Sequence, residues 1–381
     1  MKKVLIFGQA TGGNAALWFE YLNKIKSDIP DLKVTFLSRT RTTLKGKFPV
    51  FSPYGKGDVW SIFLSKVRSK LASLILIDMY LKFLGLFTKY DLVVLQGNYT
   101  PKTNLKVLSN CNGAASVVNI YGSDFYRKYK LNEFSLIESQ MFIEVLDRVD
   151  CIMINWKGVA DDFIAEFPQY KSKIKINPWG VNSRWKSLGK AKSEAANITT
   201  FISTRALHDY NNVDLVVEAF IKSFGNDSKY QLRLLAAYGI DDKVFNRIQK
   251  LAVKHSNILI EVDKWYDGDD LVQVYEQADY NICFGSTDQL SLSIVYGLLS
   301  NTVNILSPLK NYYYLHQLGF KTPVICDEIS SSSLSQVFTS IVSNDSESTK
   351  FELDGDREMA IEMFNLDRTF QQYLDLANRS T

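Results

Sequence analysis

The sequence predicts an α/β protein with two doubly wound units, because short apolar runs alternate with longer amphipathic stretches through both halves of the chain. Each apolar run has the length of a buried strand, and each amphipathic stretch has the length of a helix that connects two parallel strands. The segment 181–197, rich in lysine and turn-forming residues, separates the two halves. We therefore expect two Rossmann-like domains joined by a linker.

Five strands are expected in the first domain, residues 1–180. In chain order they are Val4–Phe7, Val34–Leu37, Leu92–Leu95, Ser116–Ile120 and Cys151–Ile154. The first of them follows two lysines, as the core of a signal peptide would, but its apolar run is too short for that role. We interpret it as the first strand of the sheet.

Six strands are expected in the second domain, residues 198–356. They are Thr200–Ser203, Gln231–Ala236, Ile258–Val262, Tyr280–Phe284, Val303–Leu306 and Val324–Ile325. The remaining stretch, 357–377, is predicted to be one helix, with the apolar side chains Met359, Met363, Phe364 and Phe370 along one face.

Charge and cysteine content disfavour several classes of protein. With a net charge of +3 over 381 residues, the chain lacks the basic surplus of a nucleic-acid-binding protein. Its four cysteines, Cys111, Cys151, Cys283 and Cys326, show no Cys-x-x-Cys spacing, which favours buried thiols in a reducing compartment over disulfides or a metal centre. No run approaches the roughly twenty apolar residues that span a bilayer, so we expect that the protein does not span a membrane. The hypothesis reached below places it in the cytoplasm.

The strongest functional signal lies where two strands of the second domain end. Arg205 follows one strand and precedes a helix, which places a guanidinium where a phosphate can be bound by fork hydrogen bonds and by the helix dipole. After the strand 280–284, Gly285 permits close approach of a ligand, and the hydroxyls and amides that follow can bind phosphate oxygens. Asp288 can accept hydrogen bonds from sugar hydroxyls or can cap the next helix. Together the two loops predict a nucleotide-diphosphate site.

A glycine loop, 8–13, follows the first strand of the first domain. Its spacing is not Gly-x-Gly-x-x-Gly, and no acidic residue closes the second strand, so a dinucleotide-dependent dehydrogenase is disfavoured. Gly12 and Gly13 in this loop either lie against a ligand or serve only a tight turn.

The two loops of the second domain resemble those of the GT-B retaining glycosyltransferases of family four, and the resemblance extends over most of the chain. The family motif Gly-Arg-Leu with Lys-Gly corresponds to 204–206 and 211–212, so the arginine is kept and the phosphate-binding lysine is absent. The family's glutamate pair corresponds to Asp288 and Tyr296, so only the first acid remains. The resemblance implies two Rossmann-like domains facing each other across a cleft, with the last helix returning to the first domain. It also implies that residues 1–180 bind the acceptor and that residues 198–356 bind the nucleotide-sugar donor.

The resemblance also implies which residues surround a nucleotide sugar. Tyr121 stands where the family has a histidine that reaches the transferred sugar, and Asp124 beside it would contact the acceptor or cap a helix. His208 would either replace part of the missing charge or be a solvated loop histidine without a role in binding. Tyr296 would stack on the nucleoside or only pack in the core. The expected catalytic residues are Arg205, Asp288, Tyr121 and Asp124. The expected donor contacts are Gly12, Gly13, Arg205, His208, Gly239, Trp265, Gly285, Ser286, Thr287, Gln289, Leu290, Ser291 and Tyr296.

Two further segments bear on metal and membrane binding. Residues 267–269 read Asp-Gly-Asp, like the metal motif of a different glycosyltransferase fold, but they precede a helix, where acids stabilise the dipole. We therefore expect no metal there. The segment 60–87 mixes apolar and basic side chains, which is typical both of core helices with a solvated face and of helices resting on an anionic bilayer.

The resulting hypothesis is a metal-independent, retaining glycosyltransferase without a cofactor. It would move a hexose from a nucleotide diphosphate sugar, a UDP-sugar being favoured, to a growing surface glycan such as O-antigen, lipopolysaccharide or capsule. A lipid-linked acceptor and peripheral contact with the inner face of the plasma membrane belong to this hypothesis. The alternative is a non-catalytic GT-B protein that binds a glycan or a partner enzyme, because the lysine, the second glutamate and the histidine are absent. A GT-B epimerase is disfavoured by the presence of only three histidines.

Overall fold

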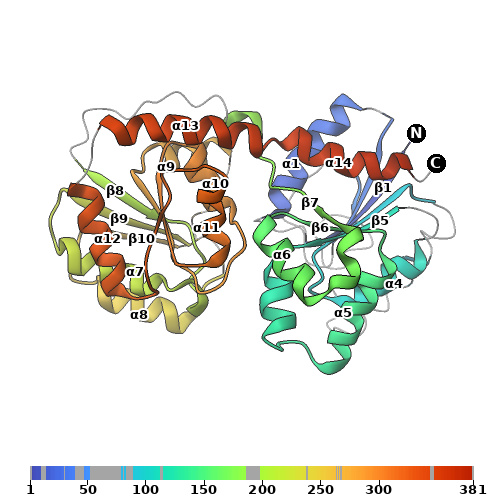
Figure 1. The fold of residues 1–381 in the computed structure, drawn as a ribbon, viewed down its shortest axis with the longest axis horizontal. Helices are drawn as coiled ribbons and strands as arrows, with labels where there is room; N and C mark the ends of the chain where they lie inside the picture. Colours follow the sequence, from blue (N-terminus) through green and yellow to red (C-terminus); the bar gives the residue numbers. More distant parts are fainter. Residues whose placement is uncertain are drawn as a thin grey trace. The chain divides into compact units, whose positions relative to one another are not determined.

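The computed structural model describes residues 2–9, 14–29, 31–38, 47–51, 79, 81–82, 89–111, 115–185, 198–236, 239–262, 264, 266, 268–343 and 347–379. The chain forms two compact units, each with its own parallel sheet (Figure 1). Unit 1 comprises Met1–Gly180 and Leu366–Thr381, and unit 2 comprises Val181–Asn365.

The sheet of unit 1 has seven strands in the order β3-β2-β1-β4-β5-β6-β7, all paired in parallel. Their bounds are β1 Lys3–Gly8, β2 Lys33–Ser38, β3 Val50–Phe51, β4 Leu92–Gln96, β5 Ala115–Ile120, β6 Cys151–Ile154 and β7 Ile174–Ile176. Most of the central strands are buried along their whole length, as a sheet covered on both faces requires. The order reverses between β1 and β4, which is the Rossmann pattern.

Helices cover both faces of this sheet (Figure 1). Their bounds are α1 Asn14–Asp28, α4 Pro101–Asn110, the π-helix η1 Asp124–Lys130, α5 Leu136–Arg148, α6 Lys157–Glu166, the 3₁₀ helix η2 Pro168–Lys173 and α14 Leu366–Arg379. Aromatic side chains join α14 to α1, with the Trp18 ring 4.7 Å from the ring of Phe370 and 5.1 Å from that of Tyr373. The last helix of the chain is therefore part of the core of unit 1.

The sheet of unit 2 has six parallel strands in the order β10-β9-β8-β11-β12-β13. Their bounds are β8 Thr199–Ser203, β9 Tyr230–Ala236, β10 Ile258–Val262, β11 Tyr280–Cys283, β12 Val303–Leu306 and β13 Val324–Ile325. This is again the Rossmann order, and it reverses between β8 and β11. In open α/β sheets the crevice at such a reversal, outside the carboxyl ends of the strands, is where ligands bind.

Unit 2 has helices on both faces of its sheet (Figure 1). They are η3 Ser183–Trp185, η4 Asp209–Asn211, α7 Val213–Phe224, α8 Asp242–Ala252, α9 Gly268–Glu276, α10 Leu292–Leu299, α11 Lys310–Gln317, α12 Ser331–Ser343 and α13 Glu347–Met363. The core beneath α7 and α12 is aromatic: Phe201, which is fully buried, packs against Phe220, Tyr280 and Phe338. Burial of these aromatic side chains stabilises the packing of the helices on the sheet of unit 2.

The expected α/β class and the two parallel sheets are confirmed, and each of the eleven expected strands is present within a residue of its predicted end. The structure adds β3 and β7, two edge strands that are too short to stand out as apolar runs.

The prediction of one helix over 357–377 is wrong. The helix breaks between Met363 and Leu366, because the carbonyl of Phe364 accepts a hydrogen bond from the amide of Val181 and Asn365 pairs with the same residue as a β-bridge. Only the part from Leu366 onward belongs to unit 1.

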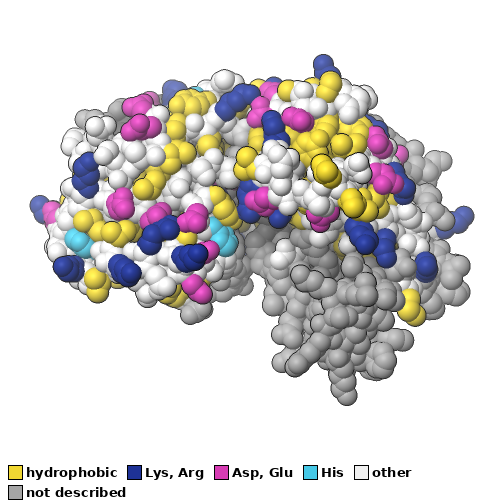
Figure 2. Space-filling view, turned by 90° about the horizontal axis from the view of Figure 1, so that it is seen from below, with side chains coloured by type: hydrophobic (Ala, Val, Ile, Leu, Met, Phe, Trp, Pro, Cys, Tyr) yellow, Lys and Arg dark blue, Asp and Glu magenta, His cyan; other side chains and the backbone are white. Residues whose placement is uncertain are grey.

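The surface carries both signs of charge. On the face shown in Figure 2, acidic and basic side chains of the described residues are interspersed, in keeping with the small net charge. No helix in the described part of the chain is long and apolar enough to cross a membrane. The segment 60–87, considered above for membrane contact, lies outside the described residues except for Met79, Leu81 and Lys82. All four cysteines are buried free thiols.

Candidate functional site

The candidate site in unit 2 lies at the reversal between β8 and β11. Arg205 comes two residues after β8, and Asp288 lies in the loop after β11. Thr204, directly after β8, is anchored because its hydroxyl lies 3.0 Å from the Tyr275 hydroxyl and 2.9 Å from the Ser293 hydroxyl. These contacts fix the position of Thr204 at the start of the loop. Arg205, the next residue, therefore lies at the carboxyl-end edge of the sheet, where a ligand is expected.

Arg205 and Asp288 form an ion pair. The Arg205 Nη2 lies 3.0 Å from Asp288 Oδ2, and the two side chains are only 16% and 11% exposed. Tyr312 of α11 donates its hydroxyl to the same carboxylate oxygen at 2.9 Å, and the amide of Gln289 donates to the other oxygen at 2.8 Å. Burial is the main reason that the pKa of Tyr312 is raised well above its usual range, and the phenol therefore stays protonated. The Asp288 carboxylate therefore interacts with the Arg205 guanidinium, the Tyr312 hydroxyl and the Gln289 amide.

The residue in place of the family's lysine is Asn211. Its Oδ1 accepts a hydrogen bond from Arg205 Nη2 at 3.2 Å, and its Nδ2 donates to the carbonyl of Ala206 at 2.6 Å. Asn212, in place of the following glycine, has a left-handed backbone with φ of 51° and donates its Nδ2 to the Phe284 carbonyl at 2.9 Å. The two asparagines thus shape the loop and tie it to the end of β11, but they add no positive charge.

Two amides of the loop from Gly285 to Ser291 donate hydrogen bonds to other groups of the protein. The amide of Ser286 donates to the Tyr210 carbonyl at 2.8 Å, and that of Gln289 donates to Asp288. A Cβ atom at Gly285 would lie 3.1 Å from the Tyr210 carbonyl oxygen, so this glycine permits the close contact between the two loops. Of the remaining expected donor contacts, Thr287 is partly exposed and Leu290 is buried, and Ser291 precedes α10.

His208 and Gly239, two of the expected donor contacts, lie close together. A Cβ atom at Gly239, whose φ is +67°, would lie 2.9 Å from His208 Nε2. The His208 ring also stacks on Tyr210, with ring centroids 5.2 Å apart. Both residues thus border the loop that carries Arg205.

Tyr296 packs inside unit 2. Its ring stacks on that of Trp185 at 4.1 Å, with only 9° between the planes, and meets Tyr275 edge-on. This geometry supports the core-packing interpretation, because one face of the ring is already covered. The other expected contacts Gly12, Gly13 and Trp265 lie outside the described residues.

The acidic segment near residue 267 gives no sign of a metal site in the described part of the chain. Asp269, at the start of α9, lies 3.4 Å from Arg184 Nη1, and no group of three His, Cys, Asp or Glu side chains among the described residues is placed to hold a metal. Asp267 itself is outside the described residues.

In unit 1, Asp124 is fully buried and joins two loops. Its carboxylate accepts hydrogen bonds from the amides of Asn98 at 2.9 Å, Tyr121 at 2.9 Å and Phe125 at 3.1 Å. The carboxylate is therefore occupied by the backbone of the loops after β4 and β5. Burial raises its pKa to about 6 although the three amides act in the opposite direction.

A raised pKa predicts that Asp124 makes the protein less stable as the pH rises. Between the ordinary pKa of an unfolded aspartate and the folded value near 6, the native state binds more protons than the unfolded state. We expect this group's contribution to the unfolding free energy to fall by about 2 kcal/mol from about pH 4 to about pH 7. Urea unfolding gives the unfolding free energy of the native chain and of Asp124→Asn at each pH in that range. The difference between the two free energies is the contribution of Asp124. A difference that does not change with pH would contradict it.

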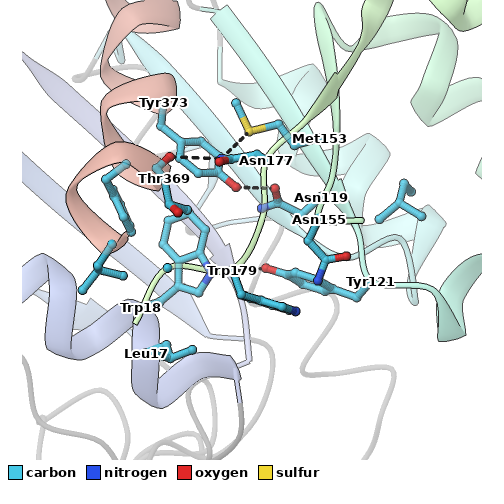
Figure 3. Close-up of a pocket in the computed structure, with 14 residues that line it drawn as sticks. Leu17, Trp18, Asn119, Tyr121, Met153, Asn155, Asn177, Trp179, Thr369 and Tyr373 are labelled. Atoms are coloured by element: carbon cyan, nitrogen blue, oxygen red, sulfur yellow. Dashed lines mark hydrogen bonds between the residues drawn. The ribbon is translucent and has the colours of Figure 1, made fainter. Parts of the chain in front are cut away.

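Tyr121 lies beside a small pocket in unit 1 (Figure 3). Its hydroxyl accepts a hydrogen bond from Trp18 Nε1 at 3.2 Å, and its ring stacks on that of Trp179 with centroids 5.3 Å apart and 11° between the planes. Burial raises the pKa of Tyr121 above its usual range, so the phenol is protonated at neutral pH and can donate a hydrogen bond.

The chain is similar over its full length to several solved structures. A glycosyltransferase from Rickettsia africae has a TM-score of 0.69 at 12% identity, with 100% of this chain and 98% of that chain covered. Sucrose-phosphate synthase from Thermosynechococcus elongatus has a TM-score of 0.75 at 11% identity, covering 100% and 99%. HepE from Anabaena, in complex with UDP-glucose, has a TM-score of 0.74 at 12% identity, covering 100% of both chains. The fold is GT-B.

At the level of sequence, no family model matches the chain, and no curated protein does. The GT-B fold expected from the two loops is thus shown by structure alone, at identities of 10–12%. Within this GT-B chain, sequence reasoning missed Tyr312, which binds Asp288, and Asn155, which lines the pocket of unit 1. Tyr312 is one of three consecutive tyrosines in α11, and nothing in the sequence distinguishes it from the other two.

Proposed function

We propose that the chain is a glycosyltransferase that uses a nucleotide diphosphate sugar. The observation that carries the proposal is the position of Arg205 and Asp288, one after each of the two strands that flank the reversal of the unit 2 sheet. A guanidinium there can bind a diphosphate, and a carboxylate beside it can accept hydrogen bonds from sugar hydroxyls. The GT-B fold supports the same reaction class, and the complex of HepE with UDP-glucose favours UDP as the first nucleotide to test.

The chemistry proposed for this site is transfer of a hexose with retention of configuration. The bond from the anomeric carbon to the diphosphate oxygen breaks, a bond to the acceptor oxygen forms, and the acceptor's proton passes to the departing diphosphate. Arg205 stabilises the charge that develops on that leaving group, so the proposed reaction needs neither a protein nucleophile nor a metal ion. A surface glycan is the proposed acceptor, and the cytoplasmic face of the membrane is the proposed place of reaction.

The ion pair has a direct consequence for donor binding. In the structure Asp288 neutralises Arg205, and a diphosphate must compete with this carboxylate for the guanidinium. We infer that the donor separates the pair, after which Arg205 binds the diphosphate and Asp288 turns to the sugar. A second candidate function, non-catalytic binding of a glycan or partner, is favoured if the pair never opens.

Binding of UDP, GDP, dTDP and CMP separates these two functions. We expect UDP to raise the melting temperature, since a ligand at a hundredfold over its dissociation constant adds about 2.7 kcal/mol of stability. Asp288→Asn should bind UDP more tightly than the native chain and transfer no sugar, because it removes the competing charge and the contact to the sugar.

The matched control is the double variant Arg205→Met/Asp288→Asn, which contains no unpaired charge and should no longer respond to UDP. If no nucleotide stabilises either the native chain or Asp288→Asn, the donor site is not where we place it. The non-catalytic function then becomes the leading one.

A further inference from the structure

The loop that carries Asp288 is bound by the connection between β12 and α11. The Ser307 hydroxyl, directly after β12, donates to the Gly285 carbonyl at 2.6 Å. In the first turn of α11, Asn311 Nδ2 donates to the Asp288 carbonyl at 2.9 Å, and the Tyr312 hydroxyl donates to the Asp288 carboxylate. This connection therefore binds both the backbone of the loop and the side chain of Asp288.

Tyr312 itself is fixed in place. Its exposed fraction is 0%, and its amide donates to the Leu309 carbonyl at 2.8 Å at the start of α11. A ring that is packed on all sides has no room to swing away from its partner. Burial raises the pKa of Tyr312 well above its usual range, so the hydroxyl keeps its proton and stays a donor toward the carboxylate.

Arg205 and Tyr312 bind the same carboxylate oxygen. Arg205 Nη2 lies 3.0 Å from Asp288 Oδ2, and the Tyr312 hydroxyl lies 2.9 Å from it. The amide of Gln289 donates to the other oxygen. The Arg205 side chain is long and 16% exposed, so it can move, whereas the Tyr312 ring cannot. When the guanidinium leaves for a diphosphate, the bond from Tyr312 therefore remains on Oδ2.

The remaining bond matters more once the cation has left. The Asp288 side chain is only 11% exposed, so water replaces little of the lost interaction, and hydrogen bonds from the protein must stabilise the charge. A hydrogen bond to an ionised carboxylate is about twice as strong as one between neutral groups. The Tyr312 hydroxyl therefore stabilises the open state, in which Arg205 binds the donor, more than it stabilises the closed ion pair.

We propose that Tyr312 is a positioning residue that allows the ion pair between Arg205 and Asp288 to open. It holds the carboxylate and compensates part of its charge while Arg205 binds the diphosphate of the donor. Asp288 can then turn only as far as its bond to Tyr312 permits, which limits the directions from which a sugar hydroxyl can reach it. This inference rests on the function proposed above, because it needs a donor that competes for Arg205.

Nucleotide titrations of the full chain test this role, with UDP or whichever of the four nucleotides above stabilises the protein. Tyr312→Phe, which keeps the buried ring, should weaken binding about fivefold, because the open state loses its hydroxyl. Asp288→Asn has no ion pair to open, so adding Tyr312→Phe to it should change the affinity by less than about twofold. Isothermal titration calorimetry gives the dissociation constants of the native chain, the two single variants and the double variant.

The dependence on Asp288 separates a positioning role from a structural one. If Tyr312 only supported the fold, its loss would weaken nucleotide binding to the same degree in the native chain and in Asp288→Asn. The matched control is Tyr313→Phe, which removes the same hydroxyl group from the neighbouring residue of α11, where the side chain is 45% exposed. It should leave the affinity unchanged in both backgrounds.

Two results would overturn the inference while the nucleotide site of unit 2 stands. One is equal weakening by Tyr312→Phe in the native chain and in Asp288→Asn, and the other is an affinity of Tyr312→Phe equal to that of the native chain. If instead no nucleotide binds to either the native chain or Asp288→Asn, the proposed function fails and this inference fails with it.

Discussion

Arg205→Met is expected to lower the unfolding free energy by about 3 kcal/mol, because it leaves the carboxylate of Asp288 buried without its cation. The remaining partners, the Tyr312 hydroxyl and the Gln289 amide, stabilise the charge only in part. Urea unfolding measures the loss directly, provided that the dependence of the unfolding free energy on urea concentration is the same in the variant and the native chain. A loss this large is typical when one member of a buried ion pair is removed.

The double variant decides whether the loss comes from the unpaired charge. Arg205→Met/Asp288→Asn should regain most of the stability, since the asparagine keeps acceptor capacity and carries no charge. Arg247→Met removes an arginine that pairs with Asp209 and Asp214 at the exposed surface, and it should change stability far less. Equal losses at both arginines would show that Arg205 is held no more tightly than a surface side chain.

Gly180→Ala is expected to destabilise unit 1 by about 3 kcal/mol. A Cβ atom at this position would lie 2.3 Å from the Leu366 Cα and 2.7 Å from Thr369 Oγ1. The nearest atom is backbone, so the first turn of α14 must move, and this helix carries Phe370 and Tyr373 into the core. Thermal unfolding monitored by near-ultraviolet circular dichroism, which reports on these aromatic side chains, measures the change.

The same substitution at Gly355 should raise the unfolding free energy rather than lower it. Gly355 lies inside α13, and a Cβ atom there would meet nothing within 4 Å. Replacing an unhindered helical glycine with alanine stabilises a protein by about 0.5–1 kcal/mol. If both variants were stabilised, the contact between Gly180 and α14 would be looser than the structure shows.

The sheets could be predicted from the sequence because buried parallel strands read as continuous apolar runs, such as Leu92–Leu95 and Cys151–Ile154. The position of Arg205 could be predicted for the same reason, since it follows directly from where a strand ends. The break at Phe364 could not be predicted, because it depends on a backbone hydrogen bond to Val181, far away in the sequence.

The candidate site was harder to predict than the fold. Arg205 and Asp288 were expected at the same site, but an ion pair between them depends on side-chain directions that no spacing encodes. The pocket of unit 1 is lined by Asn119, Asn155 and Asn177, which are far apart in the sequence and become neighbours only when β5, β6 and β7 pair. A lone asparagine after a strand is an ordinary turn residue in a sequence, and only the assembled sheet shows that three of them share a cavity.

The path of the chain also constrains the order in which the protein can mature on the ribosome. Unit 2 is one uninterrupted segment, whereas unit 1 needs Leu366–Thr381, which is synthesised after unit 2. Until α14 has been synthesised, Trp18 lacks its neighbours Phe370 and Tyr373, and the pocket of unit 1 lacks the residues of α14 that line it. Unit 1 is therefore completed only after unit 2 has been synthesised, and until then part of its hydrophobic core stays uncovered.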